Sequence, residues 1–277
     1  MSGPGEEGEE EREAGAERLV EQAGGHRTIY RLYHNFVCKT FSQREDNFYH
    51  SLPAELRRFC PRYGGTITLP PASSRYLVLE NLTQEFVKPC VLDLKMGTRM
   101  YSDTAAAAKV ASQKRKSVRT TSASLGVRFC GSYKYNCGSN SYTKVDKYTG
   151  RRADLLELTQ LVREFFSVSG GLRLDVLDYV ISQLADIKKV LTKLDGFRFY
   201  SSSLLIIYDG LKVNSRSFLK TQSEPTKPVK VKVRIIDFAN AALPGDCSGV
   251  SHSGADQGFL LGLRSIKKIL EVLKLCP

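Results

Sequence analysis

A strand-like run, residues 89–97, carries two opposite charges inside the apolar sequence Pro-Cys-Val-Leu-Asp-Leu-Lys-Met-Gly. Asp93 and Lys95 alternate with leucines, so a β-strand here directs both charged side chains to the same face. Gly97 then allows the backbone to turn tightly behind them. The segment therefore predicts either a strand whose polar face lines a cleft, or an edge strand with an exposed ion pair.

An aspartate directly follows a second predicted strand. The strand expected over residues 229–236 finishes with isoleucines, and Asp237 follows them directly. A carboxylate buried at this place needs a cation or hydrogen-bond donors to offset its desolvation. A magnesium ion between nucleotide phosphates supplies such a charge. The alternative is an aspartate that caps the next turn.

Lys39 closes a further predicted strand, within residues 28–41, and precedes a short helix that contains Glu45. In nucleotide kinases a strand lysine reaches the phosphates, and a helix carboxylate steadies it. The alternative is a lysine on the solvated surface.

A basic helix is predicted over residues 104–116. Lys109, Gln113 and Lys116 share one face of this helix, because they are spaced four and then three residues apart. Two ammonium groups and an amide on one face suit a ligand with several phosphates. A merely solvated helix and a nuclear-import signal at residues 113–116 are the alternatives.

Charge is distributed unevenly along the chain. The first 25 residues carry eight glutamates and two arginines, whereas the remaining 252 residues carry 39 basic and 21 acidic side chains. This basic excess implies a polyanionic partner. Nucleic acid, an anionic membrane surface and a small phosphate-rich ligand are the alternatives. Residues 1–20 also lack aromatic side chains, and we expect them to form a disordered acidic tail.

The rest of the chain predicts an α+β fold with two lobes. Residues 28–41 predict a strand hairpin, apolar residues at helical spacing predict helices over residues 155–166, 175–194 and 262–275, and residues 212–228 predict a polar loop. We expect residues 21–82 to form a small β-rich N-lobe with one helix, and residues 83–277 to form a larger α+β C-lobe that carries the basic helix near residues 104–117. With 42% hydrophobic and 25% charged residues, a chain of 277 residues can bury a sizeable core. No apolar stretch reaches the roughly 20 residues that cross a bilayer. A cleft between two lobes is a common place for a ligand.

Missing motifs exclude several classes of protein. The sequence has no GxxxxGKS/T loop of a Walker-type ATPase, no HRD or GxGxxG motif of an ordinary protein kinase, and no GxSxG or HExxH motif. An RNA-recognition motif is also absent. The seven cysteines are scattered without zinc-ligand spacing, so we interpret them as reduced core residues of a cytoplasmic or nuclear protein.

Three motifs follow one another in the order found in one enzyme family. They are PxxxDxKxG at residues 89–97, Ser-Ser-Leu-Leu at residues 202–205 and Ile-Asp-Phe-Ala at residues 236–239. On these motifs the chain resembles the inositol polyphosphate kinase family over about residues 22–275. The flanking segments are most similar to the inositol hexakisphosphate kinases; these segments are residues 89–99, 121–131, 147–152 and 199–210. The inositol polyphosphate multikinases share the three motifs but fit these flanks less well.

The resemblance implies a two-lobed, protein-kinase-like fold that binds ATP at a connector near residues 80–83. The backbones of Glu80 and Leu82 would then meet the edge of the adenine. Asp93 would hold the ribose, and Lys39 would bind the phosphates.

The resemblance also implies the catalytic groups. Lys95 would stabilise the transferring phosphoryl group and orient the acceptor, and Asp237, with Ser203 in support, would bind magnesium. The acceptor would lie against the basic helix at Lys109, Gln113 and Lys116. The family usually has histidine after Ile-Asp-Phe-Ala, where this chain has Asn240, and this departure bears on acceptor preference.

The implied activity is ATP-dependent phosphorylation of inositol hexakisphosphate to an inositol pyrophosphate. The acceptor would be a phosphate oxygen, which is already anionic, so a strong general base is not required. The alternatives are a multikinase that phosphorylates hydroxyls of lower inositol phosphates, and a non-catalytic protein that binds phosphoinositide or nucleic acid. We expect a monomer with no stable nucleic-acid partner and no membrane span.

Overall fold

The computed structural model describes most of the chain. The described residues are 17–18, 23, 29–33, 35–69, 74–168, 171–211, 229–246 and 249–275. Most of the expected acidic tail lies outside them, as do residues 22 and 24–26, the loop expected at 212–228, Cys247 and Cys276. Inside the tail, Glu17–Arg18 form strand β1, which pairs with strand β2 (Tyr30–Leu32). The expectation of disorder is therefore wrong for these residues of the tail.

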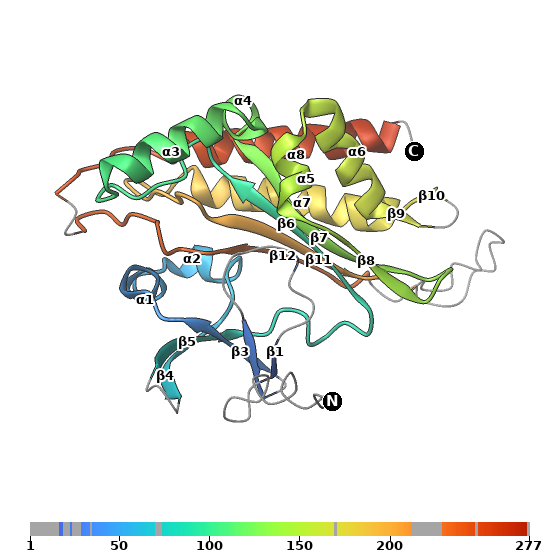
Figure 1. The fold of residues 1–277 in the computed structure, drawn as a ribbon, viewed down its shortest axis with the longest axis horizontal. Coiled ribbons are helices and arrows are strands. Elements are labelled where there is room, and N and C mark those ends of the chain that lie inside the picture. The colour runs from blue at the N-terminus through green and yellow to red at the C-terminus, as the bar shows by residue number, and fades with distance from the viewer. Residues whose placement is uncertain are drawn as a thin grey trace, which may run out of the picture.

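The first sheet is antiparallel, with strand order β1-β2-β3-β5-β4. β2 and β3 (Phe36–Thr40) form the hairpin that β-branched and aromatic residues predicted. β5 (Ser74–Glu80) pairs with β3 and with β4 (Tyr63–Leu69). Helices α1 (Gln43–His50) and α2 (Ala54–Arg57) connect β3 to β4. This sheet and its helices form the smaller, β-rich part of the molecule (Figure 1).

The second sheet has β6 (Pro89–Met96) at its centre, in the strand order β12-β11-β6-β7-β8. The other strands are β7 (Val127–Asn136), β8 (Ser141–Val145), β11 (Ser203–Asp209) and β12 (Val231–Ile236). Asp93 pairs with Leu205, and Lys95 pairs with Ser203. Because β6 is flanked on both sides, the edge-strand alternative for this segment is wrong.

The second part of the chain also supplies most of the helices. They are α3 (Ala107–Val118), α4 (Thr121–Leu125), α5 (Lys147–Arg152), α6 (Leu155–Phe166), α7 (Leu174–Leu191) and α8 (Gln257–Leu275), with a short ribbon of β9 (Ser167–Val168) and β10 (Gly171–Leu172) between α6 and α7. In Figure 1, α6, α7 and α8 lie on the side of the second sheet that faces away from the first sheet. The two sheets with helices to one side confirm the predicted α+β class.

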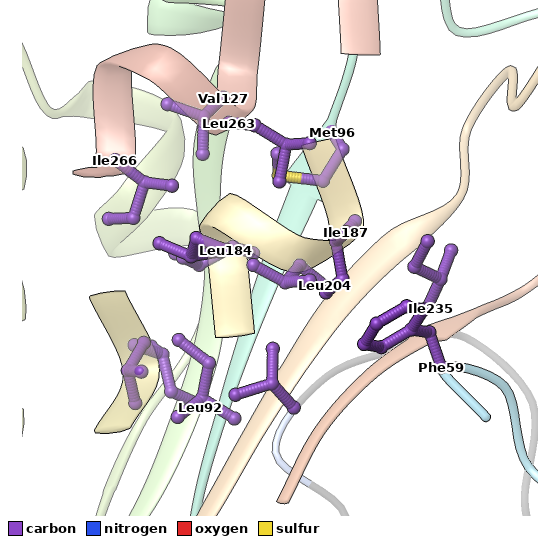
Figure 2. Close-up of a cluster of buried hydrophobic side chains, with 14 of the residues drawn as sticks. Phe59, Leu92, Met96, Val127, Leu184, Ile187, Leu204, Ile235, Leu263 and Ile266 are labelled. Atoms are coloured by element: carbon purple, nitrogen blue, oxygen red, sulfur yellow. The ribbon is translucent and has the colours of Figure 1, made fainter. Parts of the chain in front are cut away.

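The main core packs α7 and α8 against the second sheet. Figure 2 shows Leu184 and Ile187 of α7 close to Leu204 of β11, and all three side chains are buried. The same core extends to Phe59, which follows α2 and lies beside Ile235 of β12. The backbone N–H of Ile235 donates to the carbonyl oxygen of Phe59 at 2.7 Å. This contact joins the helices of the smaller lobe to the edge of the second sheet.

The last helix begins earlier than the sequence predicted, at Gln257 rather than at Gly262. Glycine lowers helix propensity, which obscured this first part of the helix. Gly262 permits close packing instead, because a Cβ at this position would lie 2.1 Å from the carbonyl oxygen of Gly126. No helix in the described ranges combines the length and hydropathy needed to cross a bilayer.

Candidate active site

A cleft with a volume of about 420 Å³ lies between the lobes and is lined by residues of both sheets, of α3 and of the connector at residues 81–88. Nine of the ten predicted site residues line it. These are Lys39, Glu80, Leu82, Asp93, Lys95, Lys109, Gln113, Lys116 and Asp237. The tenth, Ser203, does not. Segments that are distant in the sequence therefore converge on one cleft.

Lys39 is held between two carboxylates. Its Nζ lies 2.8 Å from Oε1 of Glu45 and 2.6 Å from Oδ1 of Asp237. Glu45 is fully buried on α1, and the same oxygen accepts the backbone N–H of Phe238 at 3.1 Å. Burial lowers the pKa of Lys39, but the two carboxylates outweigh burial and hold the pKa above its ordinary value. The surface alternative for Lys39 is therefore wrong.

Asp237 joins two lysines from different sheets. Its Oδ2 lies 3.2 Å from Nζ of Lys95, which also donates to the carbonyl oxygen of Ser201 at 2.9 Å. Burial raises the pKa of Asp237, but Lys39 and Lys95 together hold it well below the ordinary value. Asp237 is therefore a carboxylate, and both lysines beside it are ammonium ions.

The backbone at Asp237 has a left-handed conformation, with φ of 68°. Among residues with a side chain, aspartate and asparagine tolerate this region best, because their short polar groups bond locally. The preceding strand β12 ends at Ile236, and the turn at Asp237 directs the carboxylate into the cleft. The hydroxyl of Ser202 donates to the carbonyl oxygen of Asp237 at 3.0 Å and fixes this turn.

Asp93 lines the same cleft but is almost fully buried. Its Oδ1 has no hydrogen-bond partner among the described residues. Burial raises the pKa of Asp93, and the neighbouring Lys95 opposes this shift. A buried acceptor without a donor is costly, so this oxygen is available to a ligand with a hydroxyl or a positive charge.

Ser203 is a neighbour of the Asp93 carboxylate. It is fully buried in β11, lies opposite Lys95 in the sheet and helps to lower the pKa of Asp93. It shares a sheet face with Lys95 and Leu205, which line the cleft, but Ser203 itself is not among the lining residues. Its role as a metal ligand stays a prediction.

Apolar side chains form the walls near the connector. Both sheets contribute them; they are Val37, Leu79, Val91, Leu205 and Ile236. The connector itself is ordered by Asn81, whose Oδ1 accepts the backbone N–H of Thr83 at 3.1 Å and its hydroxyl at 2.9 Å. Apolar walls beside an ordered backbone segment suit a flat group with polar edges, such as a nucleobase.

A basic wall contains the two lysines and the glutamine predicted on α3, together with three cations from other elements. The additional residues are Arg128 of β7 and Lys147 and Arg151 of α5. Burial lowers the pKa of Lys116, and Arg151, Arg128 and Lys147 lower it further. Nη1 of Arg128 and Nε of Arg151 are buried without hydrogen-bond partners in the described part of the chain. Crowded cations with unused donors are typical of a site for a multiply charged anion.

Close packing places α5 in this wall. A Cβ at Gly150 would lie 2.2 Å from the carbonyl oxygen of Phe129, so only glycine lets α5 pack directly on β7. No sequence motif assigned a role to Arg128, Lys147 or Arg151. Their only signal was that residues 121–131 and 147–152 belong to the flanks similar to the hexakisphosphate kinases.

Asn240 also lines the cleft and contacts the basic wall. Its Oδ1 lies 3.5 Å from Nζ of Lys109. The loop that follows Asp237 is thereby connected to α3. The residue at which the sequence departs from the family pattern is thus beside the predicted acceptor wall.

The cleft has the donor set for a nucleotide and only part of a metal site. Among the described residues, four carboxylates line it, those of Glu45, Glu80, Asp93 and Asp237, and the last two lie beside Lys95. No group of three or more His, Cys, Asp or Glu side chains that fits a metal ion occurs among the described residues. Magnesium is commonly held by one or two carboxylates together with substrate phosphates, so these residues fit a metal that arrives with a nucleotide.

Comparison with known proteins identifies the family of this chain. A family model described as inositol polyphosphate kinase matches residues 76–271. Inositol hexakisphosphate kinase 1 of Rattus norvegicus is 37% identical over 224 residues, which cover 72% of this chain and 52% of that protein. Human inositol hexakisphosphate kinase 2 is 38% identical over 218 residues, with 71% and 51% covered. The chain spans about half the length of the curated relatives it matches.

Solved structures share the fold. A crystal structure of the inositol phosphate multikinase Ipk2 from S. cerevisiae, in complex with ADP and Mn²⁺, matches with a TM-score of 0.71 and 24% identity over 88% of this chain and all of that one. A second inositol phosphate multikinase structure matches with a TM-score of 0.64 and 26% identity over 82% of this chain and 98% of its own. Together with the family match over most of the chain, these likenesses confirm the resemblance seen in the sequence. The chain belongs to the inositol polyphosphate kinase family.

Proposed function

We propose that this chain is an ATP-dependent inositol polyphosphate kinase whose main acceptor is inositol hexakisphosphate, and whose product is an inositol pyrophosphate. The observation that carries this proposal is the joining of Lys39, Lys95 and Asp237 at one point of a cleft that also has a wall of cations. The hexakisphosphate kinases among its relatives support this choice of acceptor.

ATP fits the end of the cleft near the connector. The adenine would lie between the apolar walls, with its edge against the backbone at Glu80 and Leu82. The unpartnered Oδ1 of Asp93 suits a ribose hydroxyl. Lys39 then reaches the phosphates, because it extends from β3 toward Asp237.

Asp237 is the residue that would hold a divalent metal, for which we propose Mg²⁺. When bound, the metal supplies charge that offsets the repulsion between the phosphates. Lys95 lies beside the same carboxylate and would stabilise the transferring phosphoryl group. Lys39 and Lys95 neutralise Asp237 until the phosphates take over the contacts with both ammonium groups.

The cations that line the cleft favour a phosphate over a hydroxyl as the acceptor. A hydroxyl acceptor must lose a proton to a general base in the transition state. A phosphate oxygen is already anionic and needs no such base. It needs cations, and Lys109, Lys116 and Arg128 face the cleft.

The test is a panel of inositol tris- to hexakisphosphates with radiolabelled ATP and magnesium, with products separated by chromatography. We expect the hexakisphosphate to give a product with a further phosphate in a pyrophosphate bond. Products formed only from the lower inositol phosphates would identify the alternative, a multikinase that phosphorylates hydroxyls. No transfer to any acceptor would reject the kinase assignment.

Two further expectations belong to this proposal. The described cysteines form no disulfides, which supports a reducing compartment such as the cytoplasm or nucleus. A monomer is sufficient to form the cleft, because both lobes of one chain line it.

A further inference from the structure

A buried lysine of the second sheet contacts two carboxylates at the connector. Lys232 lies on β12, and its side chain is only 10% exposed. Its Nζ lies 3.1 Å from Oε1 of Glu80 and 3.2 Å from Oε1 of Glu85. Glu80 ends β5 of the first sheet, and Glu85 lies within the connector. One ammonium group therefore joins the second sheet to the last residue of the first sheet and to the segment between them.

Glu80 is fixed from both lobes. Its other oxygen, Oε2, accepts the backbone N–H of Arg62 at 3.1 Å. Burial raises the pKa of Glu80, but the Arg62 N–H and the ammonium of Lys232 together hold it below the ordinary value. Glu80 is therefore a carboxylate, and removal of Lys232 would leave its charge buried without an ammonium partner.

The rest of the connector is also bound to the second sheet. Nζ of Lys230 donates to the carbonyl oxygen of Glu85 at 2.6 Å. The carboxylate of Asp209, at the end of β11, accepts the backbone N–H groups of Val87 at 2.8 Å and Lys88 at 3.2 Å. The connector is thus attached along its length and is not a free hinge.

We propose that Lys232 is a positioning residue for the nucleotide. This inference rests on the proposed kinase function, in which the connector backbone meets the adenine. Lys232 itself is not among the residues that line the cleft, whereas Glu80 and Leu82 are. Lys232 fixes Glu80 and Glu85, and thereby sets how the connector backbone between them faces the bound base.

The connector and α3 lie at different places in the molecule, so a defect in nucleotide binding can be distinguished from a defect of the whole site. In Figure 1 the connector runs from β5 to β6 on the lower right, whereas α3 lies at the upper left. A loss of the Lys232 contacts should therefore weaken nucleotide binding and leave acceptor binding at α3 unchanged. A merely structural role would lower stability without this difference between the two substrates.

The experiment measures the Kd of ADP and the KM of each substrate for Lys232→Met, Lys232→Arg and wild type. We expect Lys232→Met to raise the nucleotide Kd and the KM for ATP about tenfold, as for the loss of one charged hydrogen bond, while the acceptor KM stays within about twofold. Lys232→Arg keeps the charge and should restore most of the affinity. Lys189→Met is the matched control, since Lys189 forms an exposed pair with Asp186 on α7 and should change neither constant.

A second variant covers the case in which Lys232→Met does not fold. Glu85 is about half exposed, so Glu85→Gln removes one of the two ion pairs without leaving a buried charge, and we expect about a threefold rise in nucleotide Kd. A folded Lys232→Met or Glu85→Gln protein with unchanged nucleotide Kd would overturn the positioning role. An equal rise in both substrate KM values would overturn it as well. Wild-type protein that binds no nucleotide would instead reject the kinase function, and this proposal with it.

Discussion

The ammonium nitrogen of Lys39 lies 2.6 Å from Oδ1 of Asp237, although 198 residues separate the two in the chain. Lys39 belongs to the first sheet, and Asp237 follows the edge strand of the second. The ion pair therefore crosses the cleft between the lobes. In the proposed kinase, phosphates would take over the contacts of the lysines and leave Asp237 available to a metal. This exchange would account for a half-buried carboxylate with two ammonium groups around it.

Asp237→Asn should abolish most phosphoryl transfer while the fold is kept. The amide has the same size and tolerates the left-handed backbone, but it offers no charge to a metal and leaves Lys39 and Lys95 without their counter-ion. We expect kcat to fall by about 10²–10³, as for the loss of other electrostatic groups in active sites. Steady-state rates and circular dichroism of the purified variant check this. Turnover close to that of wild type would show that Asp237 is not part of the reaction.

Asp237→Ala serves as a test of the backbone at the same position. Its φ of 68° is strained for alanine, so this variant should be about 1 kcal/mol less stable than Asp237→Asn. Urea unfolding of the two variants measures the difference. Equal stabilities would mean that the turn after β12 relaxes on substitution.

The ion pairs of Asp237 should make stability depend on pH in a defined window. The folded pKa of Asp237 lies below the unfolded value of about 3.9, so its contribution is complete above that pH and is lost as pH falls toward the folded pKa. The folded pKa of Lys39 lies above the unfolded value of about 10.4, so its contribution is complete below that pH and is lost as pH rises through the folded pKa. Denaturant unfolding of wild type and Asp237→Asn should differ by a constant free energy between about pH 5 and 8. The difference should shrink below about pH 4. A difference that stays constant into acid would contradict the lowered pKa.

Asp93→Asn should make the protein more stable and bind ATP less tightly. Burial raises the pKa of this carboxylate, and its Oδ1 has no partner, so the charged form is costly in the free protein. Neutralising it should raise the free energy of unfolding by about 1 kcal/mol. The ATP Kd should rise about tenfold, because the ribose loses a charged acceptor. Thermal unfolding with and without ATP measures both effects. The control is Asp186→Asn, which removes a carboxylate from an exposed pair on α7 and should change neither quantity. A loss of stability in Asp93→Asn would show that the buried charge does not destabilise the free protein.

The sequence predicted the parts of the fold that have strong periodicity. The hairpin of β2 and β3, the central strand β6 and the amphipathic helices α6 and α7 were all expected, because apolar residues recur at the period of each element. Helices α2 and α5 were not, since four and six residues are too short to show a period. The first turns of α8 were not predicted, because they contain Gly258 and Gly262, which lower helix propensity but allow close packing.

The candidate site shows the same division. Four site residues were predicted because each places a charge in or beside an apolar strand, where burial requires a compensating partner or ligand. They are Lys39, Asp93, Lys95 and Asp237. Arg128 was not predicted, because a single arginine in a strand looks like an ordinary exposed position. Its burial depends on how α5 packs over β7, which in turn depends on the absence of a side chain at Gly150. Such a tertiary contact has no local signature in the sequence.

Divalent metal should bind only when a nucleotide is present. The described residues offer Asp237 and Asp93 to a metal but no group of three ligands, so phosphate oxygens must supply the rest. Free Mn²⁺ measured by electron paramagnetic resonance should be unchanged by the protein alone. It should decrease when protein is added to ADP and Mn²⁺, beyond the effect of ADP itself, and less so with Asp237→Asn. Tight binding of Mn²⁺ by the nucleotide-free protein would contradict this arrangement.

Removal of two cations from α3 should affect the acceptor and not ATP. Lys109 and Lys116 line the cleft, whereas Lys114 and Arg115 on the same helix are exposed and do not line it. Lys109→Ala with Lys116→Ala should raise the KM for inositol hexakisphosphate at least about tenfold, because charge-assisted hydrogen bonds to phosphate are lost. The KM for ATP should stay within about twofold.

The matched control for this prediction removes the same charge from the same helix. Lys114→Ala with Arg115→Ala should leave the KM for the acceptor nearly unchanged at physiological salt, because exposed charges are screened over a Debye length of about 8 Å. If both pairs raise the acceptor KM equally, the helix acts through its overall charge and does not form a wall of the site. If the cleft-facing pair raises the KM for ATP as much as that of the acceptor, the positions assigned to the two substrates are wrong. Only a selective loss for the cleft-facing pair agrees with a phosphate site built from Lys109 and Lys116.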